Sequence, residues 1–239
     1  MAEVKKFGVA LTGWTVPPRP VGDVLEGATV RLERMDPDVH AADLFRAWSG
    51  HDGLWDYLGS GPFSSAAAYH RFVKDTAMGD DPLFYVVRQK DSGHCSGVAS
   101  YLRIAPEAGS IEVGHITFAP EMNRSRASTE TMFLMMEWAF GNGYRRYEWK
   151  CNALNMPSRR AAQRLGFSYE GIFRQHMVSR GRNRDTAWFS VIDAEWPALR
   201  EAYAAWLSPR NFDGKGKQLE SLADLTRLAR TGQSDPAPG

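Results

Sequence analysis

The stretch from Ser110 to Phe167 constrains the fold most strongly, because a strand, a polar turn, an apolar helix and a second strand follow one another without a gap. Residues 111–118 alternate and are rich in β-branched and aromatic side chains, which predicts a strand ended by Ala119-Pro120. Apolar side chains dominate residues 132–140, so the helix that contains them is expected to be largely buried. Residues 146–152 alternate again and predict the second strand.

The polar turn before this helix is a candidate anion-binding site. We expect Ser128 to cap the helix and Glu130 to complement the positive end of its dipole. Backbone N–H groups at a helix start attract phosphate or pyrophosphate, and arginine side chains add charge-assisted hydrogen bonds. The turn residues considered for this role are Asn123, Arg124, Ser125, Arg126, Ala127, Ser128 and Thr129. A surface loop with solvated arginines is the alternative interpretation of the same residues.

A short helix follows the second strand, with Pro157 in its first turn and Gly166 as its C-terminal stop. The succession of elements, together with Asn-x-x-Ser at residues 155–158 and Leu-Gly-Phe at residues 165–167, resembles the GNAT superfamily of acyl-CoA-dependent N-acyltransferases. Within it the chain looks most like the RimJ/RimL-like branch, which modifies protein N-termini and assorted small amines. The resemblance runs from about Gly27 to Leu207.

The resemblance implies a fold and a reaction. The fold is a single α/β (α+β) domain with a mixed, mostly antiparallel central sheet of about seven strands flanked by helices. The sheet should be splayed between the strands at 111–118 and 146–152. The reaction is transfer of the acetyl group of acetyl-CoA to a primary amine, of a small molecule or a protein N-terminus, by direct attack of the amine on the thioester. Succinyl-CoA or another donor would use the same anchoring.

Individual site residues also follow from the resemblance. The pantetheine arm should pair with the backbone of residues 116–118, which are Ile116, Thr117 and Phe118, while Gly114 fits a bulge that splays the strand. Asn155 should bond the same arm, and Ser158 should lie near the sulfur. The family's tyrosine acid falls at Ala162, which excludes a tyrosine from that position and leaves Tyr169 as a weaker substitute.

Two residues are candidates for the general base. Glu112 lies on the strand beside the expected acceptor site, and His115 has the better unperturbed pKa for relaying an amine proton. Strict alternation places the two on opposite faces, although a bulge at Gly114 would change that. The loop at residues 49–63 should border the amine pocket, with His51, Trp55 and Tyr57 as specificity candidates. Their alternative role is to cover an edge of the core.

One departure from the family pattern bears on activity. Small residues are expected in the pyrophosphate turn where this chain has Arg126 and Ser128, and a glycine would allow close backbone approach. Two arginines can replace lost backbone contacts with side-chain ones. A degenerate protein that binds acyl-CoA or a partner without transfer is the alternative.

Composition and the absence of certain motifs argue against several other classes of function. A net charge of +1 gives no sign of general nucleic-acid binding, and two cysteines are too few for a disulfide framework or a zinc site. Phosphate-binding-loop, dinucleotide and nucleophile-elbow motifs are absent, and no metal cluster is visible. No long apolar run occurs, so we expect a cytoplasmic protein without membrane contact. Oligomeric state stays open, a homodimer included.

The rest of the chain is expected to supply the remaining elements. Residues 1–26 should form an extended N-terminal segment, 27–207 the acyltransferase domain, and 208–239 a weak C-terminal helix followed by a disordered tail over 233–239. The further predicted strands are 27–34, 82–89, 97–104, 167–178 and 186–192, and the further predicted helices are 38–48, 64–77 and 194–207.

Overall fold

The computed structural model describes residues 7–231 and contains one eight-stranded sheet flanked by helices. The strands lie in the order β1-β2-β3-β4-β5-β6-β8-β7. They are β1 Leu25–Glu26, β2 Val30–Arg34, β3 Leu83–Gln89, β4 Cys95–Ala105, β5 Ser110–Phe118, β6 Arg146–Asn152, β7 Ser168–Ser179 and β8 Arg182–Ile192. The eighth strand is the two-residue β1, inside the segment predicted to be merely extended. The predicted α/β domain with a mixed, mostly antiparallel sheet is thereby confirmed.

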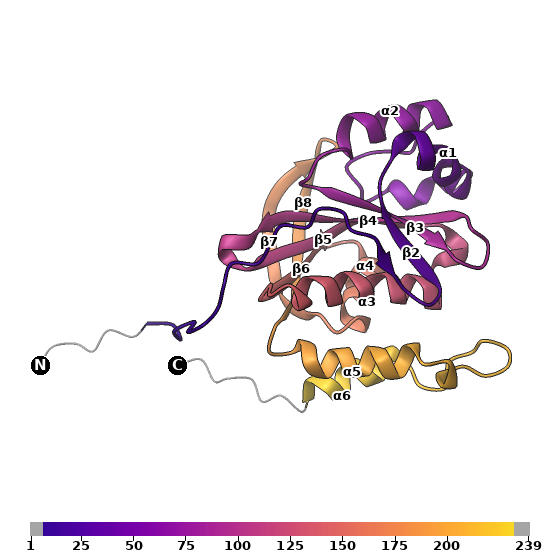
Figure 1. Ribbon diagram of the computed structural model, residues 1–239. Coiled ribbons are helices and arrows are strands. Elements are labelled where there is room, and N and C mark those ends of the chain that lie inside the picture. The colour runs from indigo at the N-terminus through magenta and orange to yellow at the C-terminus, as the bar shows by residue number, and fades with distance from the viewer. Residues whose placement is uncertain (1–6, 232–239) are drawn as a thin grey trace, which may run out of the picture.

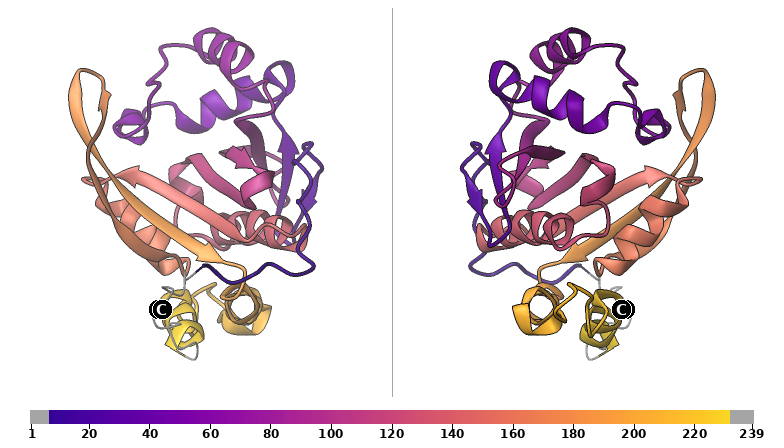
Figure 2. Two further views of the ribbon diagram at one scale, coloured as in Figure 1. Left: turned by 90° about the vertical axis from the view of Figure 1, so that its left-hand side faces the viewer. Right: turned by 90° about the vertical axis from the view of Figure 1, so that its right-hand side faces the viewer.

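Helices cover both faces of the sheet (Figure 1). The α-helices are α1 Pro37–Trp48, α2 Ala66–Thr76, α3 Arg126–Gly141, α4 Met156–Arg164, α5 Trp196–Leu207 and α6 Leu222–Thr231. Helices α1 and α2 lie on one face and α3 and α4 on the other, while α5 and α6 lie beyond α3 (Figures 1 and 2). One hydrophobic core lies under α1 and α2, and a larger one joins the sheet to α3, α5 and α6.

The parallel pair β5 and β6 creates the opening on which the site depends. Every other pairing in the sheet is antiparallel, and these two strands pair only from Ser110–Arg146 to Val113–Trp149. Both strands continue beyond that point without pairing to each other, β5 to Phe118 and β6 to Asn152. The predicted splay is therefore present, and it leaves backbone polar groups on one edge of β5 without a strand partner in the sheet.

Helix α3 begins earlier than predicted, and its cap differs. It starts at Arg126, and the Ser125 hydroxyl, rather than that of Ser128, accepts a hydrogen bond from the helix, from the Ser128 N–H at 3.1 Å. Glu130 was expected to face the helix dipole, but its side chain is buried against the turn between β1 and β2. Glu130 is the fifth residue of α3, and its side chain points to whatever packs on that side of the helix. Here a hairpin distant in sequence supplies backbone N–H donors.

Other boundaries also differ from the predictions, among them the following three. Residues 27–29 form the turn before β2, so that strand begins at Val30. β8 begins at Arg182, four residues earlier than predicted, because the hairpin turn needs only Arg180 and Gly181. The last predicted helix begins at Trp196. The tail predicted to be disordered over 233–239 lies outside the described residues.

The extended segment before β1 packs along one edge of the domain. The Tyr144 hydroxyl donates to the carbonyl of Pro18 at 3.0 Å, and Arg19 donates to the carbonyl of Ile104 at 3.0 Å. These contacts connect the segment to the end of β4 and to the turn that follows α3. Between residues 7 and 231 no helix combines the length and the apolar character needed to cross a membrane.

Candidate active site

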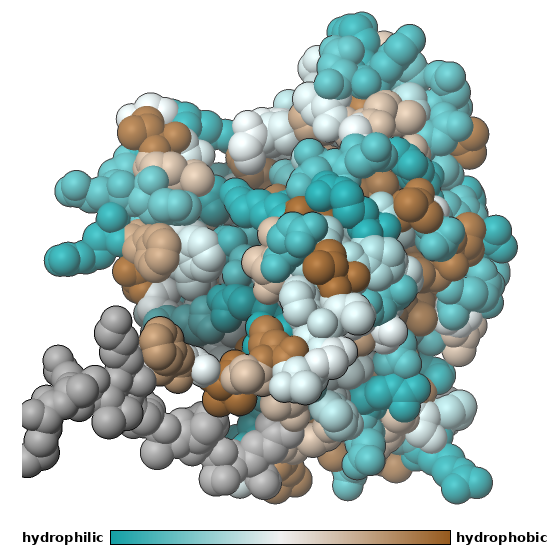
Figure 3. All heavy atoms as spheres, turned by 60° about the vertical axis from the view of Figure 1, so that its left-hand side comes forward, coloured by the Kyte–Doolittle hydropathy of each residue, from teal (hydrophilic) through white to brown (hydrophobic). Residues whose placement is uncertain are grey.

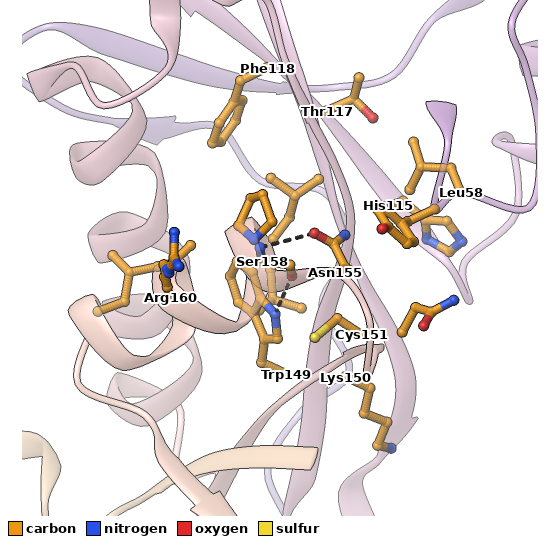
Figure 4. A pocket seen from close by; sticks show the side chains of 18 of the residues that line it. Leu58, His115, Thr117, Phe118, Trp149, Lys150, Cys151, Asn155, Ser158 and Arg160 are labelled. Atoms are coloured by element: carbon orange, nitrogen blue, oxygen red, sulfur yellow. Dashed lines mark hydrogen bonds between the residues drawn. The ribbon is translucent and has the colours of Figure 1, made fainter. Parts of the chain in front are cut away.

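A cavity of about 1020 Å³ passes through the gap between β5 and β6. Its walls come from β4 to β8, from the starts of α3 and α4, and from the loop between α1 and α2. Figure 3 shows the molecule from a side where hydrophilic side chains surround a central recess. Figure 4 shows residues that line the cavity; in this view Asn155 lies between Ser158 and His115, and Phe118 lies above them.

Positive charge collects at one end of the cavity. Arg124, Arg160 and Arg164 line it there, next to the first turn of α3. The guanidinium groups of Arg124 and Arg160 bond to no other side chain or carbonyl among residues 7–231, whereas Arg164 donates to the Thr129 hydroxyl at 3.2 Å. The N–H groups at the start of α3 precede its first intrahelical bonds. Cations beside a helix start form a suitable site for a phosphate or pyrophosphate.

The two arginines of α4 that line the cavity were not identified from the sequence, and one other arginine was placed wrongly. Arg126 was expected in the anion site, but its side chain donates to the Leu207 carbonyl, lies over the ring of Phe212, and does not line the cavity. It joins α3 to the end of α5. Arg160 and Arg164 are four residues apart and therefore share one helix face, which is the pattern that could have identified them.

Asn155 and Ser158 are held together at the start of α4. The Asn155 side chain caps the helix by accepting from the Ser158 N–H at 3.1 Å. The Trp149 indole N–H donates to the Ser158 hydroxyl oxygen at 3.0 Å (Figure 4). An oxygen that accepts from Trp149 keeps its own proton available to a group in the cavity. The predicted role of Ser158 near a sulfur is compatible with this geometry.

Cys151 also lines the cavity, beside Ser158. Its side chain is buried, and burial raises the pKa of the thiol, although the neighbouring Ser158 hydroxyl partly opposes that shift. Only the thiolate is an effective nucleophile. The protonated Cys151 is therefore poorly suited to form an acyl-enzyme intermediate.

His115 occupies a bulge in β5. Register is lost between Val98–Thr117 and Ser100–Gly114, which gives β5 one extra residue, and the φ of His115 is 50°. The bulge thus lies beside Gly114, as the sequence suggested, but the positive φ belongs to His115. Consequently Glu112 and His115 line the same cavity despite their odd spacing. Bulges often re-aim a side chain next to an active site.

Ser100 fixes the His115 ring. The Ser100 hydroxyl donates to the Gly114 carbonyl at 3.2 Å and lies 2.8 Å from Nδ1 of His115. A hydroxyl has one proton, so a hydroxyl that donates to Gly114 accepts from Nδ1–H and leaves Nε2 with its lone pair. The ring opens on the cavity, yet the protein packed around it lowers the pKa of His115, and the Arg103 guanidinium lowers it further. The neutral form is thereby favoured.

Glu112 lies in a different environment. Its buried carboxylate accepts from Arg103 Nη1 at 2.9 Å and from Lys150 Nζ at 2.8 Å, and Lys150 also pairs with Glu148 at 2.7 Å. Burial raises the pKa of Glu112, and Lys150 and Arg103 oppose that shift. A carboxylate held by two cations would have to break ion pairs in order to accept a proton. Of the two predicted bases, His115 has the more suitable surroundings.

The loop between α1 and α2 closes the cavity from the other side. Tyr57 lines the cavity, and its hydroxyl donates to the Leu154 carbonyl at 3.4 Å. Trp55 is buried among aromatic rings under α1 and α2, and His51 is exposed; neither lines the cavity. Arg180, at the tip of the β7–β8 hairpin, donates to carbonyls of this loop, including Gly61 at 2.9 Å. Figure 2 shows this hairpin rising toward the α1–α2 layer.

The predicted pantetheine path follows the open edge of β5. Thr117 and Phe118 pair with β4 on one side, and no strand of the described chain pairs with them on the other. All three residues of this path, Ile116, Thr117 and Phe118, line the cavity, as do Asn123, Ser128 and Thr129. Ser125 and Ala127 do not line it. In the described part of the chain, His, Cys, Asp and Glu side chains form no group of three suited to a metal ion.

Known proteins resemble this chain in both sequence and fold. Residues 29–168 match the family model described as the acetyltransferase (GNAT) domain. A GCN5-related N-acetyltransferase from Brucella melitensis superposes with a TM-score of 0.89 at 47% identity, covering 91% of this chain and 100% of that one. The uncharacterized N-acetyltransferase p20 of Bacillus licheniformis is 24% identical over 170 residues, which are 70% of this chain and 92% of that protein.

A RimL ribosomal L7/L12 α-N-protein acetyltransferase resembles the chain more distantly, with a TM-score of 0.62 at 19% identity over 74% of this chain and 99% of that one. At that identity the likeness concerns the fold. The match over residues 29–168 and the splayed β5–β6 pair lead to one conclusion. The chain belongs to the GNAT acetyltransferase family.

Proposed function

We propose that the protein is an N-acetyltransferase that transfers the acetyl group of acetyl-CoA to a primary amine, of a small molecule or a protein N-terminus. The observation that carries the proposal is the cavity in the β5–β6 gap, with cations at one end and Asn155, Ser158 and His115 around its middle. It connects an anion-binding end to a polar centre through an unpaired strand edge. This is the order in which CoA presents its phosphates, its amide-bearing arm and its thioester.

The residues present fit CoA despite the missing small residues in the turn. Among residues 7–231 the guanidinium groups of Arg124 and Arg160 have no hydrogen-bond partner, and the open edge of β5 at Ile116–Phe118 offers backbone partners to an extended arm. Asn155 already accepts from the Ser158 N–H, which leaves its amide N–H₂ to donate toward the arm. Arginine side chains of α4 thus replace the contacts that the backbone N–H groups of a glycine-rich turn would make with the phosphates.

Direct attack is the mechanism that the side chains favour. His115, neutral and held by Ser100, accepts a proton from the acceptor amine at Nε2, directly or through one water. Ser158, whose oxygen accepts from Trp149, donates a hydrogen bond to the departing thiolate and keeps its own proton, and the thiolate is protonated from solvent as CoA leaves. Proximity and orientation supply the remaining acceleration. Cys151 stays protonated and forms no acyl intermediate.

Binding of CoA can be tested by melting the protein with and without CoA or acetyl-CoA. Ligand at about one hundred times its dissociation constant stabilises the folded state by about 2.7 kcal/mol. For a chain of this size the melting temperature should rise by roughly 5 to 10 °C. An unchanged melting temperature at saturating ligand would contradict the anion site and the proposed function together.

The role of Ser158 can be tested separately with Ser158→Ala. We expect kcat to fall on the order of a hundredfold, because the developing thiolate loses a hydrogen-bond donor, while the Kd for CoA changes less than about twofold. Ser179→Ala, at the end of β7 and outside the cavity, is the matched control. An equal loss of kcat and CoA affinity would mean that Ser158 only supports binding.

A further inference from the structure

Arg184 presents an unpaired charge to the cavity. It lies near the start of β8 and lines the cavity wall, where its Nε is fully buried and has no hydrogen-bond partner in the part of the chain that the structure describes. Within residues 7–231 no carboxylate or carbonyl accepts from its guanidinium group. A guanidinium carries five donors and a permanent charge, so partial burial without an acceptor opposes folding. The position is explained if the acceptor is a ligand.

The strand that pairs with β8 at Arg184, β7, contains a large bulge at this point. β7 and β8 pair at Phe173–Thr186 and again at Met177–Arg184, so three residues of β7 oppose only Asp185. Gln175, in the middle of this bulge, has a φ of 50°, and its N–H donates to the Asp185 carboxylate at 2.8 Å. A positive φ in a residue other than glycine is costly, and such strain gathers at functional sites.

The bulge also contributes a second polar group to the cavity that Arg184 lines. His176 lines the same cavity and lies with Nδ1 2.9 Å from the Thr186 hydroxyl. Nε2 of His176 bonds to nothing in the described chain, so it remains free to bond a ligand. Thr186 is buried, which makes the His176 orientation part of the fold.

Neighbouring acids do not neutralise Arg184. Glu112 pairs with Arg103 and Lys150, and Glu148 pairs with Lys150 and with Arg146 at 2.7 Å. On the loop side Asp56 also lines the cavity, but it forms no ion pair with Arg184. Arg184 therefore forms no ion pair within residues 7–231, although the charge of Glu112 acts on it from a distance.

Arg184 lies near the part of the cavity assigned to the thioester, and it is not one of the cations assigned to the CoA phosphates. Ala153 N–H donates to the Asp185 carbonyl at 2.9 Å, which sets Arg184 beside the loop that leads to Asn155. The Arg184 charge also acts on the Cys151 thiol, which neighbours Ser158. A ligand group bound by Arg184 is thus close to the reacting atoms.

We propose that Arg184, with His176 beside it, binds a carboxylate carried by one of the two substrates. A guanidinium binds a carboxylate through paired hydrogen bonds, and His176 adds a further one. The carboxylate belongs either to the acceptor, which is then an amino acid or an acidic peptide, or to a dicarboxylic acyl group on CoA. This inference rests on the proposed function.

The experiment compares matched substrates that differ only in the charge. On the donor side, succinyl-CoA is compared with butyryl-CoA. On the acceptor side, free amino acids are compared with their amides, and peptides with glutamate at the second position are compared with the glutamine versions. We expect kcat/KM to favour the carboxylate about tenfold or more in one arm, which identifies its source.

Arg184→Gln should abolish that preference, and Arg182→Gln should preserve it. Arg182 lies on the same strand but is exposed and outside the cavity. The melting temperature of Arg184→Gln should not fall, because the variant loses a charge without an acceptor; a fall would indicate a structural role. Carboxylate binding can also be measured without turnover, from melting temperatures. The wild type is melted with succinyl-CoA or butyryl-CoA, and the CoA-bound protein is melted with each member of the acceptor pairs.

The outcomes separate this inference from the proposed function. If acetyl-CoA binds and neutral amines are acetylated, but no carboxylate is preferred by rate or by binding, only the carboxylate site is wrong. It is also wrong if the preference survives Arg184→Gln. If acetyl-CoA itself does not bind, the proposed function is wrong instead. In that case, binding of a carboxylate to the protein without CoA would still test whether Arg184 binds carboxylates.

Discussion

Replacing His115 with asparagine should lower kcat/KM about 10²- to 10⁴-fold, the usual contribution of a general base, while the affinity for CoA stays the same. Asparagine tolerates the positive φ of this position and can still bond Ser100, so the bulge should persist. What the variant lacks is a group that accepts a proton near neutral pH. The measurement is steady-state kinetics together with a CoA titration.

The pH profile gives this prediction a sharper readout. The pKa of His115 is lowered by the surrounding protein, so the base is neutral at pH 7 and becomes protonated only as the pH falls through that lowered value, below 6.5. In the wild type kcat/KM should fall along an acid limb there, and His115→Asn should lose that limb. Ser100→Ala retains the ring but not its fixed tautomer, and should give an intermediate loss.

His94→Asn provides the control, because His94 is exposed in the turn between β3 and β4 and lies outside the cavity. An unaltered acid limb in His115→Asn would show that the limb belongs to another group. The base would then have to be sought elsewhere in the cavity, with Glu112 as the remaining predicted carboxylate.

Replacing Glu130 with alanine should destabilise the fold by about 3 to 5 kcal/mol, since each buried donor left unpaired costs about 1 to 3 kcal/mol. The buried carboxylate accepts from the N–H groups of Ala28 at 2.7 Å, Thr29 at 2.6 Å and Val30 at 3.1 Å, and from the Thr29 hydroxyl at 2.5 Å. It fixes the β1–β2 turn on α3. A Cβ on Gly27 would lie 2.6 Å from this carboxyl group, so the turn needs glycine there.

The expected fall in melting temperature is roughly 10 °C or more for a chain of this length, measured by calorimetry or circular dichroism. Glu137→Ala, two turns further along α3, is the matched control, because its carboxylate pairs with the exposed Arg200. Exposed pairs of this kind contribute little, so the control should melt like the wild type. Equal melting temperatures for the two variants would contradict the role assigned to Glu130.

The order of the elements was predictable because it follows from local patterns. Strand alternation in residues 111–118 and 146–152, the apolar helix between them and the Asn-x-x-Ser cap each depend on residues a few positions apart. The splay of the sheet could be expected as well, since a family resemblance implied it. Boundaries set by longer-range contacts were wrong, as at Ser125 and Arg182, where a cap and a tight hairpin turn decided the result.

The partners of the charged groups in the cavity, by contrast, could not be predicted from the sequence. Arg126 stands in the predicted anion turn, yet it bonds to the end of α5, and the cations that line that end include Arg160 and Arg164 of another helix. Glu112 forms ion pairs with Lys150 and Arg103, which lie on two different strands. No spacing in the sequence reveals such partners, because they meet only when the strands pair.

By itself, then, the sequence determined which segments become strands and helices, that one helix would be buried, and that Asn155 and Ser158 would meet at a helix start. Periodicity and capping act over a few residues, so they can be read before folding. Only the tertiary structure decided which side chains face the cavity. Bulges in β5 and β7 shift the alternation, and His115 and His176 consequently line the cavity. That shift depends on the register of neighbouring strands.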